Sequence, residues 1–233
     1  MKSEIRRNQQ VITTQELALA SSLAALLAAS TFIPLTPFIG GPGFITLAIV
    51  MLPIIAAILR PVPATATALV GALVMVVSPQ LNLYTVFGFF GLLIPVITVA
   101  AGSVAFHHKM GPVIPWAYVL TGAAYYLAYS QGGTLFWLVP YGLVVVSLPV
   151  ALRASGTLNI GLLALYTAMC EQVTMNVLSI SLAHIIGPAW TAITPLMYLE
   201  RTLATVGGAT AIIALKSILR TRVELSHFLR EVN

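Results

Sequence analysis

The sequence contains no aspartate and one cysteine, and charged residues make up only 7% of its 233 residues. A soluble domain carries about 25% charged residues, so this chain has too few to cover a water-exposed surface. The absence of aspartate excludes catalysis by paired aspartates and Asp-based Mg²⁺ or EF-hand sites. Because Cys170 is the only thiol, an intramolecular disulfide and a multi-cysteine zinc site are excluded as well.

The common catalytic motifs are also missing from the sequence. It has no P-loop, no Gly-x-Ser-x-Gly, no His-Glu-x-x-His and no Gly-x-Gly-x-x-Gly. Nothing in it pairs a nucleophile with a matched base. These absences favour binding or transport over catalysis, and we expect no cofactor, no bound metal and no nucleic-acid partner.

The chain is rich in long apolar runs: hydrophobic residues make up 59% of it. Such runs between sparse charges predict an all-α, polytopic transmembrane helical bundle in the cell membrane. Breaks at Pro, Gly and charge clusters divide it into eight apolar segments. They cover residues 16–33, 44–59, 62–78, 84–106, 112–129, 135–152, 159–186 and 195–217. The short pair 44–59 and 62–78 is also compatible with half-spans, which gives six to eight membrane segments.

The basic residues predict the orientation of these segments. When eight spans alternate from a cytoplasmic N-terminus, ten of the eleven Lys and Arg residues fall on the cytoplasmic side, and Arg201 lies within the last span. The outer loops, 34–43, 79–83, 130–134 and 187–194, contain no Lys or Arg. We therefore expect one integral membrane domain over residues 1–233, with residues 1–15 and the basic tail 221–233 both cytoplasmic.

Small residues form a stripe along the first helix. Ala20, Ala24 and Ala28 are four residues apart and share one face. In lipid, helices associate through close backbone approach, which small side chains allow. The stripe fits packing inside the bundle or docking to another membrane subunit. Similar patches occur within 62–78 and 195–217.

Polar residues interrupt the seventh segment near its middle. Glu171, Gln172 and Asn176 lie on one side of the predicted helix, with Met175 and Ser179 in the same sector. Ionisable groups at membrane depth are costly, so this stripe must face protein or a wet cavity. It is either a hydrogen-bond network that holds the bundle together or part of a ligand cavity.

Four further residues near the predicted outer side are candidates for a binding site. His184 and Trp190 follow the polar stripe, and Glu200-Arg201 lies in the last span. A lone His is also a common structural residue, and Trp at an interface is also a headgroup anchor. Arg201 can reach Glu171 or extend outward, so the charges fit a structural ion pair as well as a substrate contact.

The first outer loop combines three prolines and three glycines with an apolar tip. This composition predicts an irregular, partly stiff segment. Phe38, Gly40 and Gly41 would form a lid over a cavity that opens outward, because a lid needs hinges and an apolar underside. A simple connector is the alternative.

Several of these features together resemble a known family. They are the alanine stripe, the Pro/Gly loop followed by Phe44-ITLAIVMLPIIAAILRPVPATATALVGAL, the helix with Cys170-EQVTMN, then Gly187-Pro-Ala-Trp and Pro195-LMYLERTLATVGGATAIIALKSIL. The chain resembles the S component, the substrate-binding membrane subunit, of energy-coupling factor transporters of archaeal type. The resemblance covers most of the chain. The eight expected segments depart from the family's usual six-span core.

The resemblance implies a subunit of an ATP-driven importer of a vitamin or related micronutrient. Such a subunit captures small-molecule cargo outside and docks to a membrane coupling protein and two ATP-binding cassette ATPases. On this basis Ala20, Ala24 and Ala28 would contact the coupling protein, and the later helices with the first loop would form the site. The Met-His N-terminus of the nickel and cobalt members is missing here, which argues against metal cargo.

Two other classes of function remain open from the sequence. One is a membrane-embedded enzyme acting on a lipid or isoprenoid, for which Glu171 and His184 are the obvious acid/base pair. They are 13 residues apart, roughly 20 Å along one helix, so they could not act on one atom unless the helix breaks. The other is a scaffold or assembly protein held by its small-residue faces.

Overall fold

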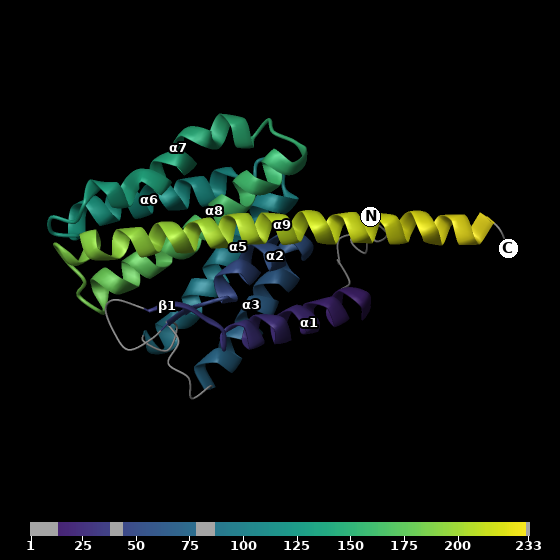
Figure 1. The fold of residues 1–233 in the computed structure, drawn as a ribbon, viewed down its shortest axis with the longest axis horizontal. Coiled ribbons are helices and arrows are strands. Elements are labelled where there is room, and N and C mark those ends of the chain that lie inside the picture. The colour runs from purple at the N-terminus through teal and green to yellow at the C-terminus, as the bar shows by residue number, and fades with distance from the viewer. Residues whose placement is uncertain (1–13, 38–43, 78–86, 232–233) are drawn as a thin grey trace, which may run out of the picture.

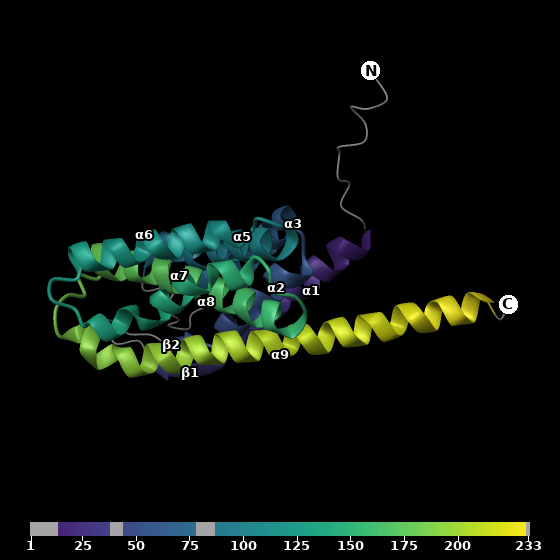
Figure 2. The ribbon, with the colours of Figure 1, turned by 90° about the horizontal axis from the view of Figure 1, so that it is seen from above.

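The computed structural model describes residues 14–37, 44–77 and 87–231, with side chains for all of these except 75–77 and 219–231. The described chain is all-α, as predicted, apart from one pair of short strands (Figures 1 and 2). In order the elements are α1 (Thr14–Ser30), β1 (Pro34–Pro37), β2 (Phe44–Thr46), α2 (Ala48–Ile58), α3 (Pro61–Val77), η2 (Gly88–Leu92), α5 (Leu93–His107), α6 (Val113–Tyr129), η3 (Leu135–Leu138), α7 (Val139–Ala151), α8 (Gly156–Ser181) and α9 (Ala189–Glu231).

Each predicted apolar segment contains one α-helix, but most of these helices are short. Among the described residues, one continuous helical stretch, Gly88–His107, is long and apolar enough to cross a membrane. Three other apolar helical stretches, Ala48–Ile58, Pro61–Val74 and Leu135–Ala151, are shorter. The helical class is therefore confirmed, and the crossing of a membrane by the whole bundle stays a prediction.

Helix α8 forms the centre of the molecule. It packs against α2, α5, α6, α7 and α9. Between Leu163 and Ile180, every side chain except Leu165 and Val177 is buried. The polar stripe of this helix is thus enclosed by protein, as predicted from the cost of exposing it to lipid.

Glycines allow two helices to approach α8 closely. A Cβ added to Gly102 of α5 would lie 2.5 Å from Thr167 Oγ1, and one added to Gly122 of α6 would lie 2.5 Å from Val173 Cγ2. Both distances are far below van der Waals contact. The backbone of α8 is therefore surrounded at distances that a side chain on these neighbours would prevent.

The small-residue patches on the other helices are also used inside the bundle. Ala64, Ala68 and Ala72 of α3 are fully buried. A Cβ on Gly208 of α9 would lie 2.5 Å from Pro53 of α2, where these two helices pack together. These contacts show that the small-residue patches of α3 and α9 take part in packing inside the bundle.

The first loop begins and ends in a strand pair rather than in irregular chain. β1 and β2 are antiparallel, with Thr36 opposite Ile45 and a bulge between Pro34 and Thr36. Residues 38–43, which include the predicted lid residues Phe38, Gly40 and Gly41, lie outside the described residues.

Helix α9 is longer than the predicted segment 195–217. Its 43 residues, roughly 65 Å at 1.5 Å per residue, run without a break from Ala189 to Glu231. Figure 2 shows its last turns projecting from the end of the bundle at which α1 begins. The backbone of the predicted tail therefore continues this helix through residue 231.

An ion pair joins α1 to the α2–α3 turn. The Arg60 guanidinium donates to both carboxylate oxygens of Glu16, with Nε 2.9 Å from Oε1. This contact raises the pKa of Arg60. Glu16 also lies in the first turn of α1, where a carboxylate interacts favourably with the helix dipole.

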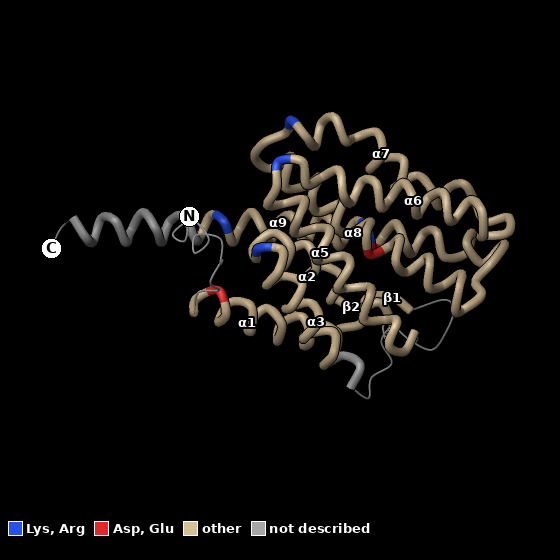
Figure 3. Tube along the Cα trace, turned by 180° about the vertical axis from the view of Figure 1, so that it is seen from behind, with Lys and Arg blue, Asp and Glu red and all other residues tan. Residues whose placement is uncertain are grey.

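Basic residues gather at one end of the bundle. Arg60, Lys109 and Arg153 lie in the turns α2–α3, α5–α6 and α7–α8, which alternate helices bring to the same end. Figure 3 shows the blue Lys and Arg positions concentrated there, on the side where α9 projects. The described turns that contain Lys and Arg thus lie together, as the predicted alternation requires, and the membrane side that they face stays a prediction.

The close approach of α6 to α8 predicts that alanine substitutions at two glycines have different effects on stability. Gly122→Ala should lower the free energy of unfolding by about 1–3 kcal/mol, because Val173 must move. Gly161→Ala, which adds the same methyl group where no atom lies within 4 Å, should be neutral or raise stability by up to about 1 kcal/mol through helix propensity. Thermal melting of the full chain in detergent measures both, and equal shifts would contradict the packing described.

Candidate functional site

Three charged side chains meet between α8 and α9. Arg201 Nη1 lies 2.7 Å from Glu171 Oε2 and donates to the carbonyl oxygen of Ala168, also at 2.7 Å. Its Nη2 is 3.9 Å from Glu200 Oε2. All three side chains are at least 96% buried. The predicted ion pair is thus present, and two carboxylates share one guanidinium.

Glu200 also connects α9 to the strand pair. The Thr36 hydroxyl of β1 donates a hydrogen bond to Glu200 Oε1. Both side chains are buried. The base of the first loop is therefore fixed over the charged cluster by a residue 164 positions away in the sequence.

An amide pair on α8 continues the polar stripe. Gln172 and Asn176 form a 2.9 Å hydrogen bond, and Tyr141 of α7 hydrogen bonds to Asn176. Trp137 Nε1 lies 2.8 Å from the Asn176 amide and can only donate. Asn176 therefore presents its oxygen to Trp137 and Tyr141 and its NH₂ to Gln172. Gln172 must then accept with its own oxygen, so its NH₂ points away from Asn176.

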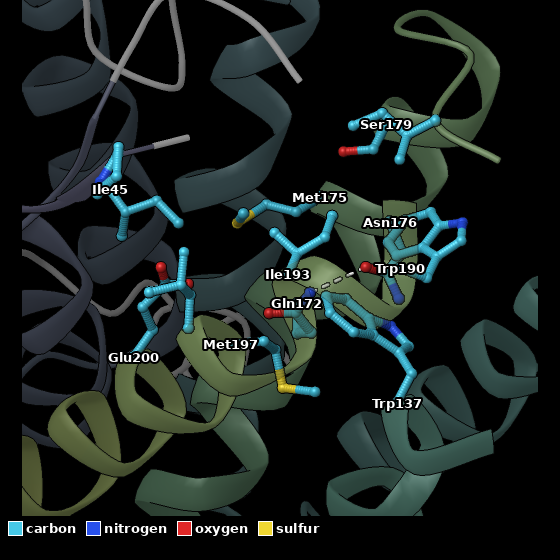
Figure 4. Close-up of a pocket in the computed structure, with 13 residues that line it drawn as sticks. Ile45, Trp137, Gln172, Met175, Asn176, Ser179, Trp190, Ile193, Met197 and Glu200 are labelled. Carbon is cyan, nitrogen blue, oxygen red and sulfur yellow. Dashed lines mark hydrogen bonds between the residues drawn. The ribbon is translucent and has the colours of Figure 1, made fainter. Parts of the chain in front are cut away.

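The outer atom of the Gln172 amide has no protein partner although the side chain is 2% exposed. It borders a cavity between α8, α9 and the strand pair (Figure 4). Figure 4 shows Ile45 on one side of this space and Trp137 and Trp190 on the other. The lining residues are Pro37, Ile45, Trp137, Gln172, Met175, Asn176, Ser179, Ile185, Trp190, Ile193, Leu196, Met197 and Glu200.

The cavity is narrow in this conformation. Its water-accessible volume is about 30 Å³, close to the share of one water molecule in the liquid, inside a concavity of about 390 Å³ that includes space open to solvent. Two of its walls are the unbranched side chains of Met175 and Met197, which fill irregular gaps and repack easily. Ligands larger than water require these side chains to move.

Aromatic rings make the wall opposite the strand pair. Trp190 packs edge-on against Trp137, with ring centroids 4.8 Å apart, and against Tyr126 at 5.3 Å. All three are buried. Rings in contact at these distances stabilise one another beyond the area they bury, so this wall is rigid.

The structure brings together most, but not all, of the predicted site residues. Gln172, Asn176, Trp190 and Glu200 line the cavity. Glu171 and Arg201 form an ion pair and are not among the cavity-lining residues. His184 is also not among them. It is an exposed residue in the α8–α9 turn with a φ of 52°, outside the cavity lining, and its role in the site stays a prediction.

Two residues in or beside the cavity had no signal in the sequence. Trp137 contacts Asn176 from a segment 39 residues earlier in the chain, and Thr36, which does not line the cavity, reaches Glu200 from the first loop. Of the lining residues outside the predicted site, Met175 and Ser179 stood out beforehand, because they lie in the same sector of the helix as the polar stripe. No group of three or more His, Cys, Asp or Glu side chains in the described ranges is arranged to hold a metal ion.

The alanine stripe of α1 divides between two environments. Ala20 and Ala24 line a shallow apolar groove between α1 and α3, together with Ser21, Pro63 and Ala66 among others. Its volume is about 150 Å³. Ala28 is buried and is not among the residues that line this groove, and its contact with a coupling subunit stays a prediction.

No protein family, curated protein or solved structure matches the chain.

The shared guanidinium predicts that removing Arg201 causes a large loss of stability, part of which a second substitution restores. Arg201→Met leaves the Glu171 and Glu200 carboxylates buried without a cation, which should cost about 3–5 kcal/mol of unfolding free energy. Adding Glu171→Gln removes one of these charges and should restore part of the loss. Thermal melts of the wild type, both single variants and the double variant give the coupling energy, and simple additivity would refute the shared ion pair.

Proposed function

We propose that this protein is a multi-pass membrane subunit that binds a small-molecule micronutrient outside the cell and delivers it through an ATP-driven importer. In this proposal the chain has no ATPase of its own. It docks to a membrane coupling protein, which is attached to two ATP-binding cassette ATPases, as the resemblance to S components implies. The cargo is a vitamin or a related compound.

The observation that carries the proposal is the cavity beside the charged cluster. Buried polar groups are normally hydrogen bonded within the protein, and the outer atom of the Gln172 amide is not. Next to it lies the Glu200 carboxylate, and apolar and aromatic side chains form the remaining walls. An apolar site with a few convergent polar groups is the usual form of a small-molecule site.

The position of the cavity supports capture from outside. It lies among the last turns of α8 and the first turns of α9, away from the turns that contain Arg60, Lys109 and Arg153. The positive-inside rule places those turns in the cytoplasm. The cavity then faces the outer side, and α9 projects into the cytoplasm.

The groove between α1 and α3 supports docking to a second membrane protein. Its small residues would let a partner helix approach closely, which drives association in lipid. Exposed apolar side chains, Leu17 and Val70, border it. This groove, rather than the whole alanine stripe, is the proposed contact with the coupling protein.

A membrane-embedded enzyme is less compatible with the geometry. Its candidate base, Glu171, is bound by Arg201, and its candidate acid, His184, is an exposed turn residue. The pair therefore does not meet at a common substrate atom. A scaffold role would not explain why the buried Gln172 amide has an atom without a hydrogen-bond partner.

The proposed topology predicts which residues are reached from outside. In a Cys170→Ala background, single cysteines at Leu135 and Thr191 should react with a membrane-impermeant maleimide on intact cells. Cysteines at His108 and Ser155 should react only after permeabilisation. All four positions are exposed in the structure, so differences report sidedness. Labelling at residue 108 in intact cells would contradict the proposed topology and indicate the opposite orientation.

The docking groove predicts a separation of binding from assembly. Ala66→Leu adds bulk to an exposed residue of the groove and should reduce the coupling protein and ATPases recovered with the chain by about tenfold, or ~1.4 kcal/mol. Quantitative mass spectrometry after affinity purification from native membranes measures the subunits and any retained cargo. Ala124→Leu makes the same change on the exposed side of α6 and should have no effect. Equal losses in both variants, or none, would remove the groove from the interface.

A further inference from the structure

We infer that the cavity selects a small organic cation, whose charged N–H group binds Glu200 and whose apolar body lies against the tryptophan wall. This inference rests on the proposed binding function and names its substrate class. A zwitterionic cargo would need both a carboxylate and a guanidinium in the cavity, and Arg201 does not line it. Three separate observations support the inference: the net charge of the buried cluster, the unpaired atom of the Gln172 amide, and the wall formed by Trp137 and Trp190.

The charge balance of the buried cluster leaves a negative charge at the cavity. Glu171 holds the Arg201 guanidinium at 2.7 Å, whereas Glu200 lies 3.9 Å from it. Glu171 does not line the cavity, and Glu200 does. A buried carboxylate without a full counter-charge is costly, so a cation placed in the cavity gains both attraction and relief of that cost.

The same geometry excludes an anion. Arg201 is the one cation within this buried cluster, and it is occupied by Glu171 and by the carbonyl oxygen of Ala168. An anionic cargo would therefore meet the Glu200 carboxylate in the cavity, whereas the Arg201 guanidinium does not line the cavity. Like charges at close range in a low-dielectric site repel strongly.

The neutral walls fit a flat or compact organic body. Trp137 and Trp190 line the cavity although both are almost fully buried, and the faces of indole rings attract cations. The outward NH₂ of Gln172 offers a donor for one acceptor atom of the same ligand. Met175 and Met197 are the side chains that must repack to admit it.

Three probes that share one aromatic ring and differ in net charge test the inference. Benzamidine is a cation at neutral pH, benzamide is its neutral analogue of similar shape, and benzoate is the anion. Dissociation constants are measured with the full chain in detergent by ligand-observed NMR. We expect benzamidine to bind the wild type about ten- to a hundredfold more tightly than benzamide, as one charge-assisted hydrogen bond implies, and benzoate to bind most weakly.

The carboxylate variants assign the preference to Glu200. Glu200→Gln keeps the shape and should reduce the ratio of the benzamide to the benzamidine dissociation constant to about one. Glu16→Gln removes the same charge from the α1–Arg60 ion pair, far from the cavity, and should leave the ratio unchanged. A melting curve for each variant confirms that it is folded. If Glu200→Gln is unfolded, Glu200→Asp, which keeps the charge on a shorter side chain, should still bind benzamidine more tightly than benzamide, and loss of that preference in a folded Glu200→Asp with unchanged benzamide binding would also assign it to this carboxylate.

The outcomes separate this inference from the proposed function. Equal or tighter binding of benzamide or benzoate, an unchanged ratio in Glu200→Gln, or no probe binding by the wild type would overturn the inference. Recovery of the coupling protein and ATPases with the chain is measured separately and bears only on the proposed function. A cation-selective cavity in a chain that recruits no ATPases would leave the inference standing and refute the importer.

Discussion

The ion pair between Glu171 and Arg201 is the interaction on which the interior of this protein depends. Both groups are buried where α8 meets α9, and neither is tolerable there alone, because an uncompensated buried charge costs several kcal/mol. Their contact fixes the rotation of α9 about its axis relative to α8. That rotation in turn directs Glu200, the next residue along the chain, toward the cavity and the Thr36 hydroxyl.

The packing of α8 explains how polar groups can be held at this depth. Gly102 and Gly122 bring α5 and α6 close to α8, and Gly208 brings α9 close to α2. Tight packing excludes solvent, so a polar group there depends on partners within the protein. Trp137 orients Asn176, and Asn176 orients Gln172, so one indole N–H determines which atom of Gln172 faces the cavity. This series of hydrogen bonds ends at the outer amide atom of Gln172, to which a bound ligand could form a hydrogen bond.

The two proposed contact surfaces lie on different parts of the bundle. The cavity lies between α8, α9 and the strand pair, whereas the groove lies between α1 and α3. The two sites share no residue, so a substitution in one need not disturb the other. Helix α2 packs against α1, α3, α8 and α9, and it therefore connects the two surfaces mechanically.

The sequence by itself determined the helical class, the eight helical segments and the enclosure of Glu171, Gln172 and Asn176, because hydropathy and helical period are properties of local sequence. It also determined the clustering of Arg60, Lys109 and Arg153 at one end, since alternating helices place every second turn together. Only the tertiary structure decided the roles of adjacent residues. Glu200 lines the cavity and Arg201 joins Glu171 because their side chains leave the helix about 100° apart. Contacts between distant segments, which no local pattern encodes, decide the contributions of Trp137 and Thr36, the position of His184 outside the cavity lining and the burial of Ala28.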